Sequence, residues 1–396
     1  MTQTQLAPPQ ADLADGWAPD VWLGAPSPGG LALPAAHPTL SWLYGPRSVY
    51  LDDDYLVVAD SGNHRVLVWR GVPERDEQPA DVVLGQVDAV SEGPAAEGRG
   101  PERGMHLPTG VLVHDGALLV ADAWHHRILI WDHVPAHGDQ PPDRVLGQPD
   151  ASSVEPNRGG QASARSMYWP FGIGVVAGCF YVADTGNRRV LGWAGGVPAS
   201  ADIPADLVLG QPDQAHREEN RGSGVGPASF RWPHDVTGNA EVLLVSDAGN
   251  HRVLGWRPGP SADRDADLLL GQGDFQSAVE FPYGPQRGDR FRFPYSTALD
   301  ADRLAIADTA NNRVLIWDGV PTTGRPADAV LGQPSLQANG ENRWSSVVAD
   351  TLCWPYGVSL HGDRLAVADS GNNRVMLWRR RSRGQPSALH AGSEED

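Results

Sequence analysis

Cysteine and long apolar runs are what this sequence lacks most clearly. Its 396 residues include 2 cysteines, Cys179 and Cys353, so a disulfide framework of the kind found in small secreted domains is not indicated. No apolar stretch approaches the roughly 20 residues that a membrane-spanning helix needs. The N-terminus has no basic start followed by an apolar run, so we expect no secretion signal. These features favour a cytoplasmic protein with no membrane partner.

Positive charge is also in short supply. The chain has 31 Lys and Arg residues against 49 Asp and Glu residues, which gives a net charge of −18. Because non-specific binding to nucleic acid needs a positive surface, we expect no nucleic-acid partner. The one basic run, at 379–383, lies in a polar stretch that ends in SEED. We expect residues 379–396 to form a polar, disordered tail.

Turn residues and tryptophan, in contrast, are abundant. The chain contains 46 Gly, 34 Pro and 14 Trp, and Gly, Pro, Asp and Asn separate short apolar runs. This pattern is typical of an all-β chain with many turns.

Three motifs recur in a fixed order along the chain. The first has the form ADSGNHRVLVW, and its final Trp returns every 61 to 63 residues, at Trp69, Trp131, Trp193, Trp256, Trp317 and Trp378. The second has the form ADVVLGQVD, and the third is a Pro-centred motif such as YGPRSV or YWPFGI. Each unit predicts four short strands, A to D in chain order. Six such units predict an all-β, six-bladed β-propeller with four-stranded blades.

One copy of the second motif is displaced. The last unit ends with strand C at Trp378, and the matching strand-D sequence, PDVWLGAPS, starts at Pro19. We expect 19–27 to supply the outer strand of the last blade and close the ring, because closure removes an exposed sheet edge. The predicted organisation is a flexible segment at 1–18, a propeller over 19–378 and the polar tail.

The first motif resembles the NHL repeat, whose signature is Asp-x-x-Asn-x-Arg-(Val/Ile)-x-x-Trp. The resemblance covers residues 19–378, and His125 is the one exception at the Asn position. It implies a propeller fold but leaves the function open. NHL and related propellers include protein-binding and RNA-binding platforms, enzymes such as the amidating lyase, and metal-dependent lactonases.

Residue types that all six units share are interpreted as scaffold. We expect the Asp of each B–C turn to accept backbone N–H groups, the Arg to pair with carboxylates or carbonyls, and the Trp to pack between adjacent sheets. Function is expected where the blades differ. Because consecutive strands reverse direction, the B–C turns and the long D-to-A connections should share one face and surround the mouth of the channel.

Residues at that mouth are varied, polar and aromatic. The first residues after each Pro are Arg47, Thr109, Phe171, His234, Tyr295 and Tyr356. Two positions before each Pro stand Tyr44, His106, Tyr168, Arg231, Arg292 and Cys353. Such a set resembles a ligand pocket more than a uniform core. We take His106, Phe171, Arg231 and Tyr356 as candidate binding residues, and Cys353 as a packed thiol.

The motif WPHDV departs most from its relatives, because Asp235 stands where the other units have Ser or Gly. A His and a carboxylate at a channel mouth could serve as general base and orienting group, or as metal ligands together with His106. Should the chain be an enzyme, the catalytic candidates are His234, Asp235, Tyr295 and Arg47. Adjacent residues of a strand point to opposite sides, so a hydrogen-bonded pair that lines a polar pore stays open.

The second unit carries adjacent histidines. His126 occupies a slot that holds His, Arg or Asn in the other units, which indicates a variable turn residue. His125 replaces Asn, and Trp124 replaces Gly or Ala. We interpret Trp124 and His125 as a contact point for whatever the propeller binds.

Together these features favour a non-catalytic binding or scaffold propeller. It would engage a protein partner or a small molecule through its loop-decorated face, for example as an assembly or accessory factor of a larger enzyme. The alternative is a small-molecule lyase or hydrolase with its site at the channel mouth. The sequence requires no cofactor and no metal, and it does not define the oligomeric state.

Overall fold

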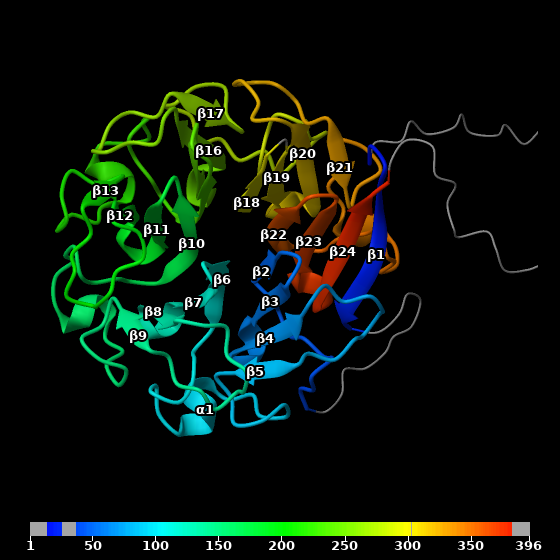
Figure 1. Cartoon of the computed structure of the whole chain (residues 1–396). Coiled ribbons are helices and arrows are strands. Elements are labelled where there is room, and N and C mark those ends of the chain that lie inside the picture. Colours follow the sequence, from blue (N-terminus) through cyan, green and yellow to red (C-terminus); the bar gives the residue numbers. More distant parts are fainter. Residues whose placement is uncertain (1–13, 26–36, 302, 382–396) are drawn as a thin grey trace, which may run out of the picture.

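Six four-stranded antiparallel sheets form a ring around a central opening (Figure 1). The computed structural model describes residues 14–25, 37–301 and 303–381. The six-bladed propeller predicted from the repeat is therefore confirmed. Within each blade the strands follow one another from the centre to the rim, so strand A lines the central opening and strand D lies outermost.

The first three blades are built from consecutive segments. Blade 1 consists of β2 (Ser48–Leu51), β3 (Tyr55–Asp60), β4 (Arg65–Arg70) and β5 (Val82–Leu84). Blade 2 consists of β6 (Pro108–His114), β7 (Ala117–Asp122), β8 (Arg127–Trp131) and β9 (Arg144–Leu146). Blade 3 consists of β10 (Pro170–Val176), β11 (Cys179–Asp184), β12 (Arg189–Trp193) and β13 (Leu207–Leu209).

The remaining blades repeat this plan up to the last strand. Blade 4 consists of β14 (Pro233–Gly238), β15 (Leu243–Asp247), β16 (Arg252–Trp256) and β17 (Leu268–Leu270). Blade 5 consists of β18 (Pro294–Asp300), β19 (Arg303–Asp308), β20 (Arg313–Asp318) and β21 (Ala329–Leu331). Blade 6 consists of β22 (Pro355–His361), β23 (Arg364–Asp369), β24 (Arg374–Arg380) and, from the start of the chain, β1 (Trp17–Gly24).

Strand β1 closes the ring, as the displaced motif predicts, by pairing antiparallel with β24. It begins at Trp17 rather than Pro19, because Trp17 and Ala18 also pair with β24. The Trp17 side chain is buried in the core. Strand β24 continues past Trp378 to Arg380, which forms an ion pair with Asp15. The rest of the expected flexible segment and disordered tail, at 1–13 and 382–396, lies outside the described residues.

The core is divided among the junctions between blades. Six apolar clusters are present in the described chain, and each combines side chains of two neighbouring blades. Trp69 of blade 1, for example, packs with Leu23 and Leu377 of blade 6. The repeated Trp therefore packs between sheets as expected, and its burial contributes strongly to holding adjacent blades together.

A buried ion pair stands at every B–C turn. Each turn is a short 3-10 helix, at Ser61–Asn63, Ala123–His125, Thr185–Asn187, Ala248–Asn250, Thr309–Asn311 and Ser370–Asn372. The Arg that follows it pairs with the Asp that precedes it, at 2.7 to 2.9 Å, in Asp60–Arg65, Asp122–Arg127, Asp184–Arg189, Asp247–Arg252, Asp308–Arg313 and Asp369–Arg374. All twelve side chains are buried.

In blades 1 to 5 the ion pair also anchors the D–A connections on both sides of its blade. In blade 3, Asp184 Oδ1 accepts the N–H of Tyr168 at 2.7 Å. Arg189 donates to the carbonyls of Ser163 and Ser166 in the preceding connection and of Gln214 in the following one. B–C turns and D–A connections therefore lie on one face, as the strand directions predict. We call this the loop-bearing face.

The Gln of the LGQ motif adds a further tie. Gln148 Nε2 donates to the carbonyls of His125 at 3.2 Å and Glu155 at 2.9 Å, which joins a B–C turn to the next connection. The same pair of hydrogen bonds from Nε2 recurs at Gln86, Gln211, Gln272 and Gln333. Long loops are thus held to the scaffold along their length.

Both cysteines are free, and burial raises the pKa of the Cys353 thiol to about 12, which agrees with a packed thiol. None of the helices within the described ranges has the length and apolar character needed to cross a membrane.

Candidate functional site

Six side chains surround the mouth of the channel, one from the start of each inner strand. In order around the ring they are Arg47, Thr109, Phe171, His234, Tyr295 and Tyr356. Their aromatic rings are in contact: the Phe171–His234 pair is tilted, with centroids 4.6 Å apart, whereas His234–Tyr295 and Tyr295–Tyr356 are stacked, at 4.4 and 4.6 Å. The Arg47 guanidinium lies 5.1 Å from the Tyr356 centroid, which adds a cation–π contact. The sequence-predicted candidates Arg47, Phe171, His234, Tyr295 and Tyr356 are therefore brought together.

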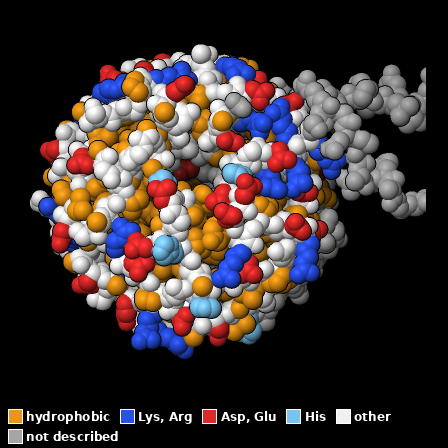
Figure 2. Space-filling view, viewed as in Figure 1, with side chains coloured by type: hydrophobic (Ala, Val, Ile, Leu, Met, Phe, Trp, Pro, Cys, Tyr) orange, Lys and Arg blue, Asp and Glu red, His pale blue; other side chains and the backbone are white. Residues whose placement is uncertain are grey.

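This ring leaves little free space. The cavity between it and the next residues inward, which include Asp235 and Ser296, measures about 30 Å³. A volume of that size holds little more than a water molecule. Below it the channel widens to a second cavity of about 260 Å³, which Asp235 and Ser296 also line. The hollow at the centre of the surface in Figure 2 marks the channel axis.

His234 is a neutral imidazole within this ring. Its Nδ1 lies 3.0 Å from the Trp232 carbonyl, which can only accept, so Nδ1 carries the proton. Burial, with a smaller contribution from the nearby Arg47 charge, lowers the pKa of His234 to about 4, although the hydrogen bond to Trp232 opposes the shift. At neutral pH the Nε2 atom is therefore an unprotonated acceptor.

Asp235 is fixed to the next blade rather than to His234. Its Oδ2 accepts the Ser296 hydroxyl at 2.7 Å and the Thr297 N–H at 3.0 Å. Ser296 Oγ in turn accepts the N–H of Val358 at 3.2 Å. Asp235 thus begins a hydrogen-bonded chain across blades 4, 5 and 6. Gly172 gives it room, because a Cβ there would come within 2.6 Å of Asp235.

The candidate metal ligands do not form a site. His106 lies beside His64 and His125, with ring centroids 5.1 and 5.6 Å away, outside the ring that holds His234. In the described part of the chain, no three His, Cys, Asp or Glu side chains are grouped so that they could hold a metal ion. The grouping of His106, His234 and Asp235 considered from the sequence is therefore wrong.

His125 is a buried part of the scaffold. Its Nδ1 lies 2.8 Å from Asp122 Oδ2, and in the other five blades an Asn amide binds the equivalent oxygen at 2.6 to 2.9 Å. His125 is 6% exposed, whereas Trp124 is 41% exposed. The expectation that both residues form a contact point is corrected: Trp124 can meet a partner, and His125 replaces a structural Asn.

The reason for this replacement lies in the preceding connection. In blades 3, 4 and 6 the turn Asn also pairs with an Asn 30 residues earlier, as in Asn157–Asn187 at 2.8 Å. In blade 2 that earlier position is Ala95, in the short helix α1 (Pro94–Gly98). Ala95 keeps the left-handed backbone of Asn157, with φ of 51° against 53°, but it has no amide to offer. The imidazole of His125 therefore stands where the other turns have an Asn, in a blade whose connection has no Asn amide to pair with it.

His126 has a different structural role. Its Nδ1 accepts the N–H of Trp169 at 3.2 Å, and His64, His251, Asn312 and Asn373 do the same for the next blade. Burial lowers the pKa of His126 to about 4, which keeps this nitrogen unprotonated. The interpretation of His126 as a variable turn residue agrees with this contact.

Exposed apolar side chains gather on the loop-bearing face. Among the described residues, the large hydrophobic side chains that are exposed are Tyr44, Val87, Val90, Trp124, Ile203, Val279, Tyr283, Trp344, Val347 and Trp354. Only Ile203 belongs to a C–D loop; the others lie in D–A connections or a B–C turn. Trp344 and Tyr283 are 80% and 91% exposed.

Aromatic contacts extend this surface toward the channel mouth. Trp124 lies 5.0 Å from Trp169, which lies 4.5 Å from Tyr168, and Arg231 lies over Trp232 at 4.9 Å. Trp124 and Arg231 are among the residues expected from the sequence, whereas Trp169, Trp232 and Trp354 are not. The signal was present in YWP, RWP and CWP, where an aromatic residue directly precedes the Pro.

Comparisons with known proteins agree with the repeat. The model of the NHL repeat matches residues 43–69, and no curated protein matches the chain. Similar solved structures include the WD40 β-propeller domain of Doa1, with a TM-score of 0.46 and 11% identity over 92% of this chain and 98% of that one. Hydrazine synthase of Kuenenia stuttgartiensis has a TM-score of 0.46 and 13% identity over 88% and 99%. Raptor of Chaetomium thermophilum has 0.43 and 12% over 94% and 30%. These similarities are too distant to transfer a function.

Asp235 makes a testable contribution to the pH dependence of stability. Burial raises the pKa of Asp235 to about 6, although its hydrogen bonds oppose the rise. The folded protein then holds this proton more tightly than the unfolded chain, whose Asp titrates near 4. We expect the free energy of unfolding of the wild type, minus that of Asp235→Asn, to fall as the pH rises from about 4 to about 6 and then to level off. Parallel profiles in urea unfolding would contradict this.

The structural role of His125 is testable by rebuilding the missing pair. Ala95→Asn together with His125→Asn restores the arrangement seen at Asn157–Asn187. We expect a favourable coupling free energy of about 0.5 to 1.5 kcal/mol between the two substitutions, the usual range for a net hydrogen bond. A double-mutant cycle of urea unfolding measures it. Additive single effects would show that position 95 does not explain His125.

Proposed function

Since the chain is a six-bladed propeller of NHL-type repeats, we propose that it is a non-catalytic binding protein whose loop-bearing face holds a protein partner. The observation that carries this proposal is the concentration of exposed aromatic side chains on that face. The exposed aromatic residues there are Tyr44, Trp124, Tyr283, Trp344 and Trp354. On the opposite face, which carries the C–D loops, Ile203 is the one large apolar side chain exposed among the described residues.

Exposure of large aromatic side chains to water is unfavourable in free energy, and their burial against a partner recovers that free energy. Large exposed apolar patches mark interaction sites, and Trp and Tyr are enriched among the residues that dominate binding energy at interfaces. Arg231 and Arg292 add polar groups beside the aromatic residues, and each is paired with a glutamate, Glu219 and Glu280. This mixture of aromatic centres and charged neighbours is typical of protein interfaces.

The connections that carry these residues are held in place before any partner binds. The buried Arg of each blade and the Gln of each LGQ motif bond to connection carbonyls. Because a preformed surface loses less conformational entropy on binding, such loops favour affinity. The net charge of −18 supports a protein partner over nucleic acid. Assembly or accessory work for a larger enzyme fits a rigid platform of this kind.

A second candidate function is that of a lyase or hydrolase at the channel mouth. It is favoured by one observation: Arg47, Tyr295 and the neutral His234 meet in one ring. Asp235, the fourth candidate, lies below the ring in contact with Ser296. The space of about 30 Å³ at the ring admits water but no substrate without rearrangement. Binding at the wider loop-bearing face therefore ranks first.

We place this activity in the cytoplasm. The thiols of Cys179 and Cys353 are both free, and unpaired thiols are typical of proteins kept in a reducing compartment.

Crosslinking from the two faces tests the proposal. A photo-crosslinking amino acid in place of Trp344 is expected to trap a protein partner in cells, whereas the same group in place of Ile203 on the other face is not. Against the trapped partner, Trp344→Ser and Trp124→Ser are each expected to weaken binding at least about tenfold, as loss of an interface aromatic does. Ile203→Ser is the matched control. Equal crosslinking from both faces, or unchanged affinity of the Trp variants, would reject the proposal.

A further inference from the structure

The outer strand of most blades is clamped to the connection that precedes the blade. The N–H of the first residue in the ADxVLGQ motif donates to a carbonyl of that connection. The bonds are Ala80 to Leu40 and Ala205 to Ala164 at 2.9 Å, and Ala266 to Pro227 and Ala327 to Gly288 at 3.0 Å. We call this contact the edge clamp.

Blade 2 has lost the donor of the edge clamp. The donor position is Pro142, and proline has no N–H to give. The acceptor position is Glu102, an exposed acidic residue where the other connections have Leu, Ala, Pro or Gly. No backbone bond therefore holds the connection at 99–105 to the start of the outer strand β9.

Blade 6 also has a proline at the donor position, but its gap is filled. Trp17, two residues before Pro19, is buried in the blade 6 core, and Ala349 of the preceding connection packs against the same cluster. The residue at the corresponding position of blade 2 is Gln140, which is exposed. Its Oε1 accepts the N–H groups of Ala136 and His137 in its own loop, at 2.6 and 3.1 Å. Gln140 therefore does not replace Trp17.

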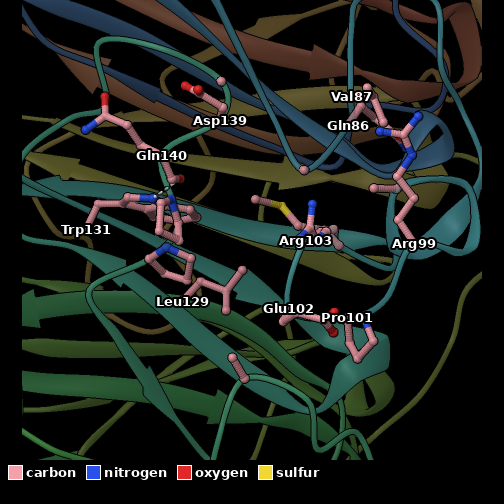
Figure 3. Close-up of a pocket in the computed structure, with 18 of the residues that line it drawn as sticks. Gln86, Val87, Arg99, Pro101, Glu102, Arg103, Leu129, Trp131, Asp139 and Gln140 are labelled. Carbon is pink, nitrogen blue, oxygen red and sulfur yellow. Dashed lines mark hydrogen bonds between the residues drawn. The ribbon is translucent and has the colours of Figure 1, made fainter.

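An open cavity of about 620 Å³ lies where the edge clamp of blade 2 is missing. This volume falls within the range of small-molecule sites. The buried side chains of Met105, Leu129 and Trp131 give it an apolar floor, and Pro101, Pro141 and Pro142 line it further. In Figure 3, Trp131 and Leu129 lie on one side, Arg99 and Gln86 on the other, and Arg103 between them. We call this cavity the blade 2 pocket.

Two of the three arginines that line the pocket form no side-chain hydrogen bond or ion pair with a described residue. Arg127 uses its donors on Asp122 and on the carbonyls of Ala151, Pro101 and Gly104. Arg99 and Arg103, in contrast, make no side-chain hydrogen bond and no ion pair within 4.0 Å to any described residue. The indole N–H of Trp131 is already bound to the Gln140 carbonyl at 3.0 Å, so its ring offers apolar contact alone.

The two acidic residues that line the pocket, Asp139 and Glu102, form no ion pair with Arg99 or Arg103. Asp139 belongs to the C–D loop and lies across the pocket from Arg99 (Figure 3). Glu102 is exposed, and its carboxylate lies over Gly100, where a Cβ would meet both oxygens at 2.5 Å. A ligand carboxylate in the pocket can meet Arg99 and Arg103, whose guanidinium groups donate no hydrogen bond to a described residue, although the charge of Arg99 also acts on the exposed Asp88. Guanidinium groups bind a carboxylate through paired N–H donors.

We propose that the blade 2 pocket binds an amphipathic carboxylate, a small molecule with an apolar or aromatic body and one acidic end. The body lies on Trp131, Leu129 and Met105, and the carboxylate is held by Arg99 and Arg103. None of Tyr44, Trp124, Tyr283, Trp344 and Trp354 lines this pocket, so the site is separate from the aromatic surface proposed for the protein partner.

Methionine offers a direct reporter of binding. The chain has 4 methionines; Met105 lines the pocket, and Met167 holds the equivalent, buried position in blade 3. With the methionine methyl groups labelled for NMR, phenylbutyrate and indole acetate are expected to shift the Met105 signal in a saturable manner and leave Met167 unmoved. The amide and amine with the same apolar body as phenylbutyrate are expected to bind at least about tenfold more weakly.

Variants separate the pocket from general effects. Arg99→Gln and Arg103→Gln are each expected to weaken phenylbutyrate binding about tenfold or more. The pair Glu102→Ala and Pro142→Ala, which recreates the Ala164 and Ala205 clamp of blade 3, is expected to close the pocket and abolish the Met105 shift while the protein stays folded. Pro19→Ala in blade 6 is the matched control and leaves binding unchanged. The proposal is overturned if neither carboxylate saturates, if the amine binds as well, or if the clamped variant still binds.

Discussion

The buried Asp–Arg pair of each B–C turn is the interaction on which the rest of this structure depends. It fixes the turn itself, accepts the N–H at the end of one D–A connection and donates to carbonyls of two. Removing one partner of such a pair would leave a buried charge uncompensated, which typically costs about 3 to 5 kcal/mol. This contact, repeated in five blades and kept with one connection in blade 6, ties the long surface loops to the scaffold, and we expect the loop-bearing face to be rigid for that reason.

Blade 2 differs from the other blades in two places around the same buried ion pair. Its connection has Ala95 where other connections have Asn, and His125 fills the space that the lost amide leaves. Pro142 breaks the edge clamp because it has no N–H, and nothing equivalent to Trp17 fills the gap, so the blade 2 pocket remains. In both places the ion pair Asp122–Arg127 is kept. The six blades therefore differ around the pair, and all of them keep it.

Much of this was readable from the sequence. The regular return of the Trp predicted the six blades, the displaced motif at Pro19 predicted closure, and strand reversal predicted the loop-bearing face. The convergence of His234, Tyr295 and Tyr356 followed from their equal places in successive blades. Sequence could not show that Asp235 turns to Ser296 rather than His234, nor that His125 is buried, because these depend on side-chain direction and on a partner 30 residues away. The blade 2 pocket depends on Pro142 and on the connection at 99–105, which lie in different parts of the repeat and meet only in the fold.

Hydrogen exchange of an Arg189→Leu variant tests most directly whether the buried pair holds the loop-bearing face. Arg189 bonds to carbonyls at Ser163, Ser166 and Gln214. The account predicts faster amide exchange in the two connections at 149–169 and 212–232, while the connection at 334–354 on the far side of the ring keeps its wild-type protection. Unchanged exchange in the first two connections would contradict the account, and so would an equal increase in all three.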